Sequence, residues 1–138
     1  MTDLSGYIEG LFWEYVYKNE DLPAAPENIY IALHTADEGN NPDGSNEVEA
    51  DSYERAEASP TDFEVVGDGP TVAENVEEIV WGDPEEEWGE ISHFSIWDGP
   101  EDTDNPLSST VELSSSRFID GDTDQVSSNP GQLVANLD

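Results

Sequence analysis

At 138 residues the chain is long enough for one domain with a hydrophobic core, and its 34 Asp and Glu residues against 3 Lys and Arg give a formal net charge of −31. Binding to nucleic acid or to an anionic membrane surface needs clustered Lys and Arg, so this composition excludes both. No run of about 20 apolar residues exists to span a bilayer, and the N-terminus does not resemble a signal peptide. The absence of cysteine excludes disulfides and thiolate metal sites.

The acidic residues are dispersed along the chain and are accompanied by a hydrophobic fraction of 35%, which a disordered acidic tail would not have. In dilute buffer so many like charges would oppose a compact state. At an ionic strength of about 1 M the Debye length is about 3 Å, so surface carboxylates scarcely repel one another. We therefore expect a folded halophilic protein, most simply from a haloarchaeal setting.

The first segment is predicted to be an amphipathic helix within residues 1–20. Its apolar residues recur from Leu4 to Tyr15 at three- and four-residue spacing, and Thr2 or Asp3 would cap it. Trp13 and Tyr17 lie off this stripe, one turn apart on the opposite face. Two readings are open: a loop covers these aromatics, or they form a contact with another subunit. They are our candidate subunit-interface residues.

After an extended connector at Leu22–Pro26, residues 27–138 alternate between short strands and turns. Seven or eight strands at such close intervals predict an all-β fold, an antiparallel, jelly-roll-like β-sandwich that forms one compact domain with the N-terminal helix. Turns are expected at 37–45, 67–70 and 121–122, and strands at 29–35, around 53–55 and 63–65, and at 76–81, 88–97, 107–113, 116–119 and 133–137.

The stretch WGEISHFSIWD, residues 88–98, is the densest apolar cluster and is predicted to be the central strand. Strict alternation would place Phe94 and Ile96 on one face, and Ile91, His93 and Trp97 on the other. We expect His93, Phe94, Ile96 and Trp97 to belong to the structural core.

No catalytic site or cofactor is predicted. The only histidines, His34 and His93, lie in predicted strands, and no G-x-S-x-G turn presents a nucleophile. With 34 acids, carboxylate pairs carry no information about glycoside hydrolysis. The segment 120–124 begins like an EF-hand, but Gln125 and Gly131 occupy the sixth and twelfth positions, so a turn explains it better and no metal site is expected.

Lysine and arginine are rare in this chain, with only Lys18, Arg55 and Arg117. A guanidinium retained in such a chain is expected to make a specific bidentate contact with a carboxylate. We expect Arg55 to form such a structural ion pair, within the domain or across a subunit boundary.

The chain resembles the tail-fibre-like family, small virion proteins of tailed phages. The resemblance rests on the amphipathic helix and proline connector, on IYIALHTADEG at 29–39, on Glu47 and the Tyr53-x-Arg55 motif, and on WGEISHFSIWD. It continues through the turn at 121–122 to the closing QLVANLD. It implies a non-enzymatic structural protein located in the virion, as a tail fibre or baseplate component or as a capsid turret or decoration. The acidic middle region looks like the version of a haloarchaeal tailed virus.

We expect a homo-oligomer that docks onto other virion proteins, with binding to a host surface glycan or protein as a further role. A trimer would suit a fibre and a pentamer a capsid vertex. Two alternatives differ in class. A carbohydrate-binding module would stack sugars on exposed Trp81, Trp88 or Trp97. A small hydrolase would need His34 or His93 in an open pocket.

Overall fold

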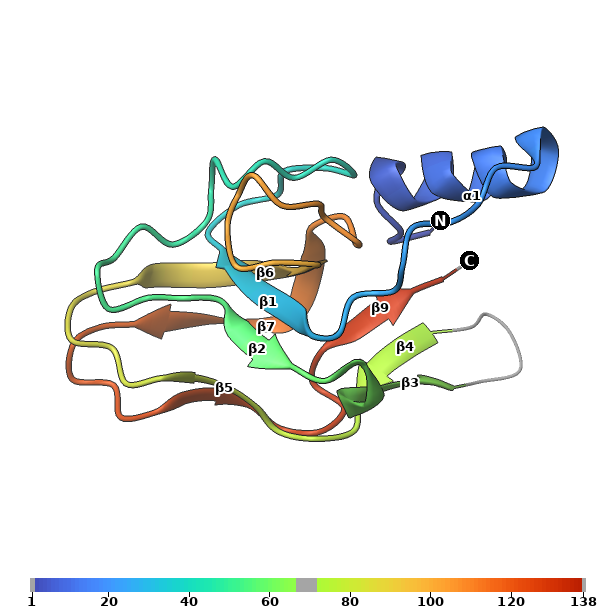
Figure 1. Cartoon of the computed structure of the whole chain (residues 1–138). Coiled ribbons are helices and arrows are strands. Elements are labelled where there is room, and N and C mark those ends of the chain that lie inside the picture. Colours follow the sequence, from blue (N-terminus) through green and yellow to red (C-terminus); the bar gives the residue numbers. More distant parts are fainter. Residues whose placement is uncertain (1, 67–71, 138) are drawn as a thin grey trace.

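The computed structural model describes residues 2–66 and 72–137, which contain one α-helix followed by β-strands (Figure 1). The turn predicted at 67–70 lies outside the described residues. The elements are α1 (Gly6–Lys18), β1 (Ile29–His34), β2 (Ala56–Ala58), the 3-10 turn Pro60–Asp62, β3 (Phe63–Val66), β4 (Val72–Asn75), β5 (Ile79–Gly82), β6 (Gly89–Trp97), β7 (Val111–Ile119), β8 (Val126–Ser128) and β9 (Val134–Asn136).

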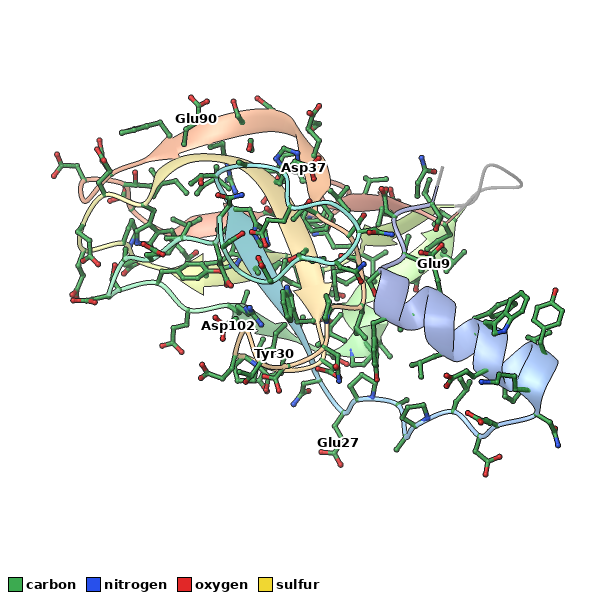
Figure 2. The ribbon with its side chains drawn as sticks, turned by 90° about the horizontal axis from the view of Figure 1, so that it is seen from above. Glu9, Glu27, Tyr30, Asp37, Glu90 and Asp102 are labelled. Carbon is green, nitrogen blue, oxygen red and sulfur yellow. The ribbon has the colours of Figure 1, made fainter. Side chains whose placement is uncertain are left out.

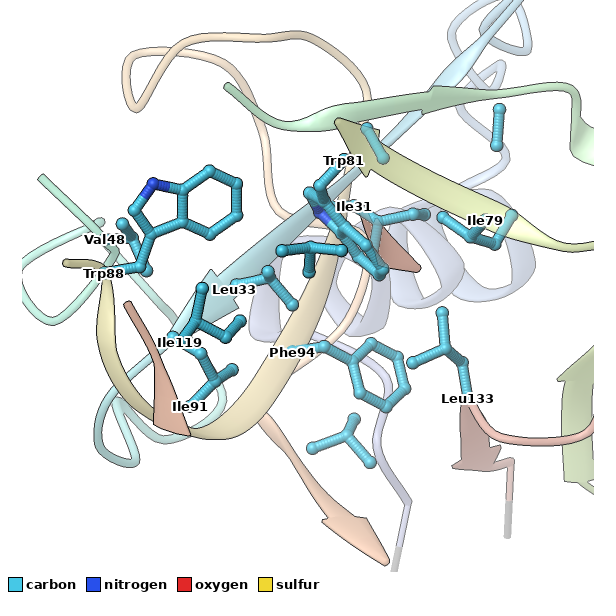
Figure 3. Close-up of a cluster of buried hydrophobic side chains, with 14 of the residues drawn as sticks. Ile31, Leu33, Val48, Ile79, Trp81, Trp88, Ile91, Phe94, Ile119 and Leu133 are labelled. Carbon is cyan, nitrogen blue, oxygen red and sulfur yellow. The ribbon is translucent and has the colours of Figure 1, made fainter. Parts of the chain in front are cut away.

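The strands form three antiparallel sheets among the described residues. The largest has the order β2-β1-β6-β7, and smaller sheets pair β3-β4-β9 and β5-β8. The core lies between β1 and β6 on one side and β5 on the other, where Ile31, Leu33, Phe94 and Trp81 are buried together (Figure 3). The all-β, sandwich-like fold with an N-terminal helix is thereby confirmed.

The central position predicted for residues 88–97 is also confirmed, because β6 pairs with β1 along one edge and with β7 along the other. The predicted assignment of faces is wrong at one residue. The register with β7 shifts between Ile91 and His93, which interrupts the alternation of side chains. As a result Ile91 joins Phe94 in the same buried cluster, whereas Trp97 lies on the opposite face.

Several strand boundaries differ from the prediction. The strand predicted at 76–81 begins only at Ile79, because the buried Asn75 ends the preceding strand β4 and its amide bonds the carbonyls of Glu77 and Asn129. The two strands predicted at 107–113 and 116–119 are joined in the single strand β7, which begins only at Val111. The strand expected around 53–55 begins at Ala56 instead.

The hydrogen bonds found between the helix and the rest of the described residues lie at its first turn. The N-cap is Ser5 and not Thr2 or Asp3: its side chain accepts from the Ile8 amide at 3.2 Å and donates to the Pro106 carbonyl at 2.6 Å. The Gly6 amide donates to the carbonyl of Asn40 at 2.8 Å. Asn19, in the left-handed conformation, ends the helix.

The burial of Phe94 makes its packing testable. Because its side chain is only 1% exposed, Phe94→Ala leaves a cavity and is expected to lower the free energy of unfolding by about 3–5 kcal/mol, as measured by denaturation in multimolar salt. Phe118→Ala is the matched control, because Phe118 is 59% exposed and its loss should change stability by no more than about 0.5 kcal/mol. Equal effects of the two substitutions would contradict the location of the core.

Candidate interaction surface

Helix α1 extends away from the sheets, and none of its residues is buried (Figures 1 and 2). Its large apolar side chains are exposed on more than one face, at 62% for Phe12, 58% for Trp13, 54% for Tyr15, 48% for Val16 and 66% for Tyr17. A helix that is apolar on most of its circumference is normally covered by protein. The helix is therefore the strongest candidate for an interaction surface among the described residues.

The candidate interface residues Trp13 and Tyr17 lie together on this helix. Their ring centroids are 4.3 Å apart and the rings are tilted by 36°. The reading in which a loop covers them is wrong, because both side chains remain more than half exposed. Their role at a subunit contact remains a prediction.

The predicted apolar stripe of α1 faces the connector and is only partly covered by it. A groove of about 480 Å³ runs between the helix, the Leu22–Pro26 connector and the segment that joins β6 to β7. Its lining is almost wholly apolar, and Asp98 is the single charged residue that borders it. The helix thus presents two apolar surfaces, this groove and the outer face that carries Trp13 and Tyr17.

Charge is distributed unevenly between the helix and the rest of the chain. Residues 6–18 contain Glu9, Glu14 and Lys18, a net charge of −1, whereas the whole chain carries −31. Other acids, such as Glu90 and Asp102, project from the periphery of the sheets and loops (Figure 2). A negatively charged partner would therefore meet the least repulsion at α1.

Arg55 lies over the face of β6 opposite the main core. It forms a bidentate pair with Glu47, at 2.9 Å from Nε to Oε2 and 2.7 Å from Nη2 to Oε1, and the two side chains are only 2% and 12% exposed. Its Nη1 donates to the carbonyls of Gly99 and Glu101, and its guanidinium lies 4.0 Å from the ring centroid of Trp97. Arg55 thus joins the loop before β2 to the loop after β6.

Tyr53 extends the same cluster. Its hydroxyl donates to Glu47 at 2.6 Å and accepts from the Leu33 amide at 3.0 Å. Burial, reinforced by the charge of Glu47, raises the pKa of Tyr53 well above its usual value, so the phenol stays protonated.

A second cluster links Glu38, His34 and Ser95 in the arrangement of a hydrolase triad. His34 Nδ1 lies 2.5 Å from Glu38 Oε2, and Nε2 lies 2.6 Å from Ser95 Oγ. A carboxylate can only accept, so Nδ1 carries the hydrogen and Nε2 accepts from the serine. However, His34 and Ser95 are both 0% exposed, and Ser95 also accepts from Trp97 Nε1. No substrate reaches this serine in the structure, which leaves the hydrolase alternative without an open site there.

The same carboxylate organises the loop that follows β1. Glu38 accepts from the backbone amides of Asp43 and Gly44 through Oε1 and of Asn46 through Oε2, at 2.8–3.0 Å. Burial lowers the pKa of His34, although Glu38 acts in the opposite direction. The imidazole is consequently a neutral structural bridge between β6 and this loop.

The tryptophans proposed for sugar stacking are buried. Trp81, Trp88 and Trp97 are 7%, 4% and 0% exposed, and their indole nitrogens donate to Ile31 O, Ser52 Oγ and Ser95 Oγ respectively. The carbohydrate-binding alternative through these residues is therefore wrong, because no indole face is open to a sugar.

The structure places the remaining predicted residues as follows. Phe94 and Trp97 are fully enclosed, Ile96 packs against the core, and His93 is half-buried with its Nδ1 near Ser92 Oγ. Arg117 departs from the expected pattern, because its Nη1 donates to the Ser127 carbonyl at 2.7 Å and no carboxylate pair with it occurs within the described ranges. The segment 120–124 is a turn between β7 and β8.

The following findings on metal sites and membrane-spanning helices apply only to residues 2–66 and 72–137. In these residues no group of three or more histidine, aspartate or glutamate side chains is arranged to hold a metal ion. None of the helices found there has the length and apolar character needed to cross a membrane.

Comparison with known proteins identifies the family. A family model described as the podophage GP4 fiber I protein gp80 matches residues 3–136. The chain belongs to this family. A comparison with curated proteins gives no match. The tail-fibre-like resemblance is confirmed at this level, and the family indicates the virion as the protein's location.

The Arg55 contacts predict that the free energy of unfolding depends strongly on the guanidinium group. Arg55→Lys keeps the charge but cannot reproduce the fork, so we expect unfolding in multimolar salt to cost about 2–4 kcal/mol less than in the wild type. Arg117→Lys is the matched control, because Arg117 makes only single bonds to Ser127 and Ser128. Wild-type stability of Arg55→Lys in a denaturant titration would contradict this role.

The lowered pKa of His34 predicts that the free energy of unfolding depends on pH. Below about pH 6.5 the unfolded chain binds a proton that the folded imidazole resists, so the free energy of unfolding falls as pH falls, by up to about 1.4 kcal/mol per pH unit. His34→Gln should be less stable at neutral pH but should show a shallower loss between pH 7 and pH 5. Identical slopes for wild type and His34→Gln would refute the assignment.

Proposed function

We propose that this protein is a non-enzymatic structural component of the virion of a halophilic tailed virus, where it self-associates through α1 and docks onto other virion proteins. The observation that carries the proposal is the match of residues 3–136 to a phage fibre protein family. The exposed aromatic surface of α1 supports the assembly part of the proposal, because a soluble monomer gains nothing from it.

The internal chemistry of the domain agrees with a structural role. The only serine–histidine–carboxylate arrangement found among the described residues is sealed beneath a loop, with Ser95 and His34 both inaccessible. Its contacts fix the loop after β1, so the arrangement acts as a support for the fold.

The location of the protein can be tested on virus particles. Antibodies against the folded protein should label gradient-purified virions of the virus that encodes it, and gold particles at the tail or at capsid vertices would separate a fibre or baseplate component from a turret. Absence of the protein from purified virions would refute the proposal. For host attachment, added protein should compete with virions for adsorption to host cells.

The proposed halophilic setting predicts that the folded state requires high salt. With a net charge of −31, circular dichroism should show loss of β-structure as salt is removed by dialysis and its retention in multimolar KCl. Replacing Glu by Gln at the exposed positions 49, 54, 64, 77 and 87 removes five charges and should move the transition to lower salt. Full structure of the wild type in dilute buffer would contradict the halophilic assignment.

A further inference from the structure

The outer face of α1 carries a stripe with large and small residues at opposite ends. Gly6, Gly10, Trp13 and Tyr17 follow one another at spacings of four, three and four residues, the spacing that places side chains on one seam of a helix. The N-terminal half of the stripe therefore has no side chains, and the C-terminal half has two of the largest.

No contact within the same copy requires a glycine at position 10, Gly10. A Cβ atom built at Gly10 would meet nothing within 4 Å, whereas one at Gly6 would meet the side chain of Asn41 at 2.5 Å. Glycine in the interior of an exposed helix costs about 1 kcal/mol relative to alanine. Gly10 thus leaves the helix backbone bare beside Trp13 at a cost in helix stability, and no part of this copy covers it; we call this open space at Gly10 the hollow.

Trp13 has the opposite property, since it projects from the same stripe and is 58% exposed. Its stacking on Tyr17 at 4.3 Å gives a rigid projection one turn from the hollow at Gly10. A projection and a hollow on one stripe are self-complementary if a second helix lies antiparallel, because residues 10 and 13 then exchange places about the midpoint of the pair.

We infer that α1 of one copy pairs antiparallel with α1 of a second copy of this chain, with Trp13 of each copy packed against Gly10 of the other. The inference rests on the proposed self-association through α1 and specifies its partner and its geometry. A parallel bundle is disfavoured by volume, since it would place Trp13 against Trp13 and leave a void where the glycines meet. The contact is two-fold, so it yields pairs of copies instead of the trimer or pentamer expected from the sequence.

The area and charge of the stripe fit a second copy. From their exposed fractions, Trp13 and Tyr17 on the stripe and Val16 beside it offer about 300 Å² per copy. In two copies these side chains bury about 600 Å², below the roughly 1,000 Å² of a stable specific interface, so the contact belongs to the weak class. Glu9 and Glu14 flank the stripe and do not lie on it, so two chains of charge −31 approach here with the fewest opposed carboxylates. We expect a weak dimer that tightens as salt rises.

The decisive experiment exchanges the projection and the hollow. Gly10→Trp and Trp13→Gly should each weaken dimerisation in multimolar KCl by about tenfold or more, as measured by sedimentation equilibrium. The double variant Gly10→Trp/Trp13→Gly restores the antiparallel fit and should return the dissociation constant to near the wild-type value. Circular dichroism checks that each variant retains its helix and sheets.

Two further variants separate packing from helix stability. Gly10→Ala should raise the unfolding temperature of the monomer, because alanine favours the helix, and should nevertheless weaken the dimer by filling the hollow. Phe12→Ala is the matched control: Phe12 is 62% exposed but lies off the stripe, so its loss should leave dimerisation unchanged.

The remaining outcomes overturn the inference in distinguishable ways. If both single variants disrupt an oligomer that the double variant fails to restore, the helices pair in another geometry. If an oligomer forms and neither single variant affects it, the self-association in the proposed function survives and this contact is refuted. A wild type that stays monomeric at all concentrations and salt levels refutes the contact and self-association together, while presence in virions would still support the structural role.

Discussion

Mutual repulsion among 34 carboxylates is the constraint to which the rest of this structure is adapted. Most acids project into solvent, where dissolved salt can screen them. Glu38 and Glu47 point inward, and each is fully engaged: Glu38 by three backbone amides and His34, and Glu47 by the fork of Arg55 and the hydroxyl of Tyr53. These two carboxylates hold the long loops over β1 and β6, so a chain with few bases uses its bases and amides where burial makes them effective.

The fold was predictable where a local pattern determined it. The strand at 88–97 could be recognised from its apolar density, and the first helix from its three- and four-residue spacing. The late start of β5 was not predictable, because the turn before it depends on Asn75 bonding to Glu77 and to the distant Asn129. Likewise, nothing local to Ile91 indicates the register shift that turns it into the core, since β7 imposes that shift.

The same distinction applies to the candidate surface. Sequence periodicity separated Trp13 and Tyr17 from the apolar stripe of α1, but it left open whether a loop covered them. The cluster of Glu38, His34 and Ser95 was missed, because Ser95 lies 61 residues from His34 and is brought to it only by the pairing of β1 with β6. A single signal was available: Glu38 lies four residues after His34, within reach across a tight turn. Gly10 was missed because a glycine in a sequence does not reveal whether its own molecule fills the space beside it.

In the halophilic setting that we propose, a contact of an aromatic side chain with glycine has an advantage over a contact built on ion pairs. Concentrated salt weakens surface ion pairs, and this chain has only Lys18, Arg55 and Arg117 with which to make them. Salts that are excluded from protein surfaces strengthen apolar burial, so the same medium that permits the acidic surface also favours covering Trp13 and Tyr17. Folding and assembly would then respond to salt in the same direction. High salt would both stabilise the compact domain and strengthen the association of α1 with a partner. The anchoring of α1 through Ser5 and Gly6 fits this arrangement, because a helix hydrogen-bonded at one end can offer the rest of its length to a partner without disturbing the sheets.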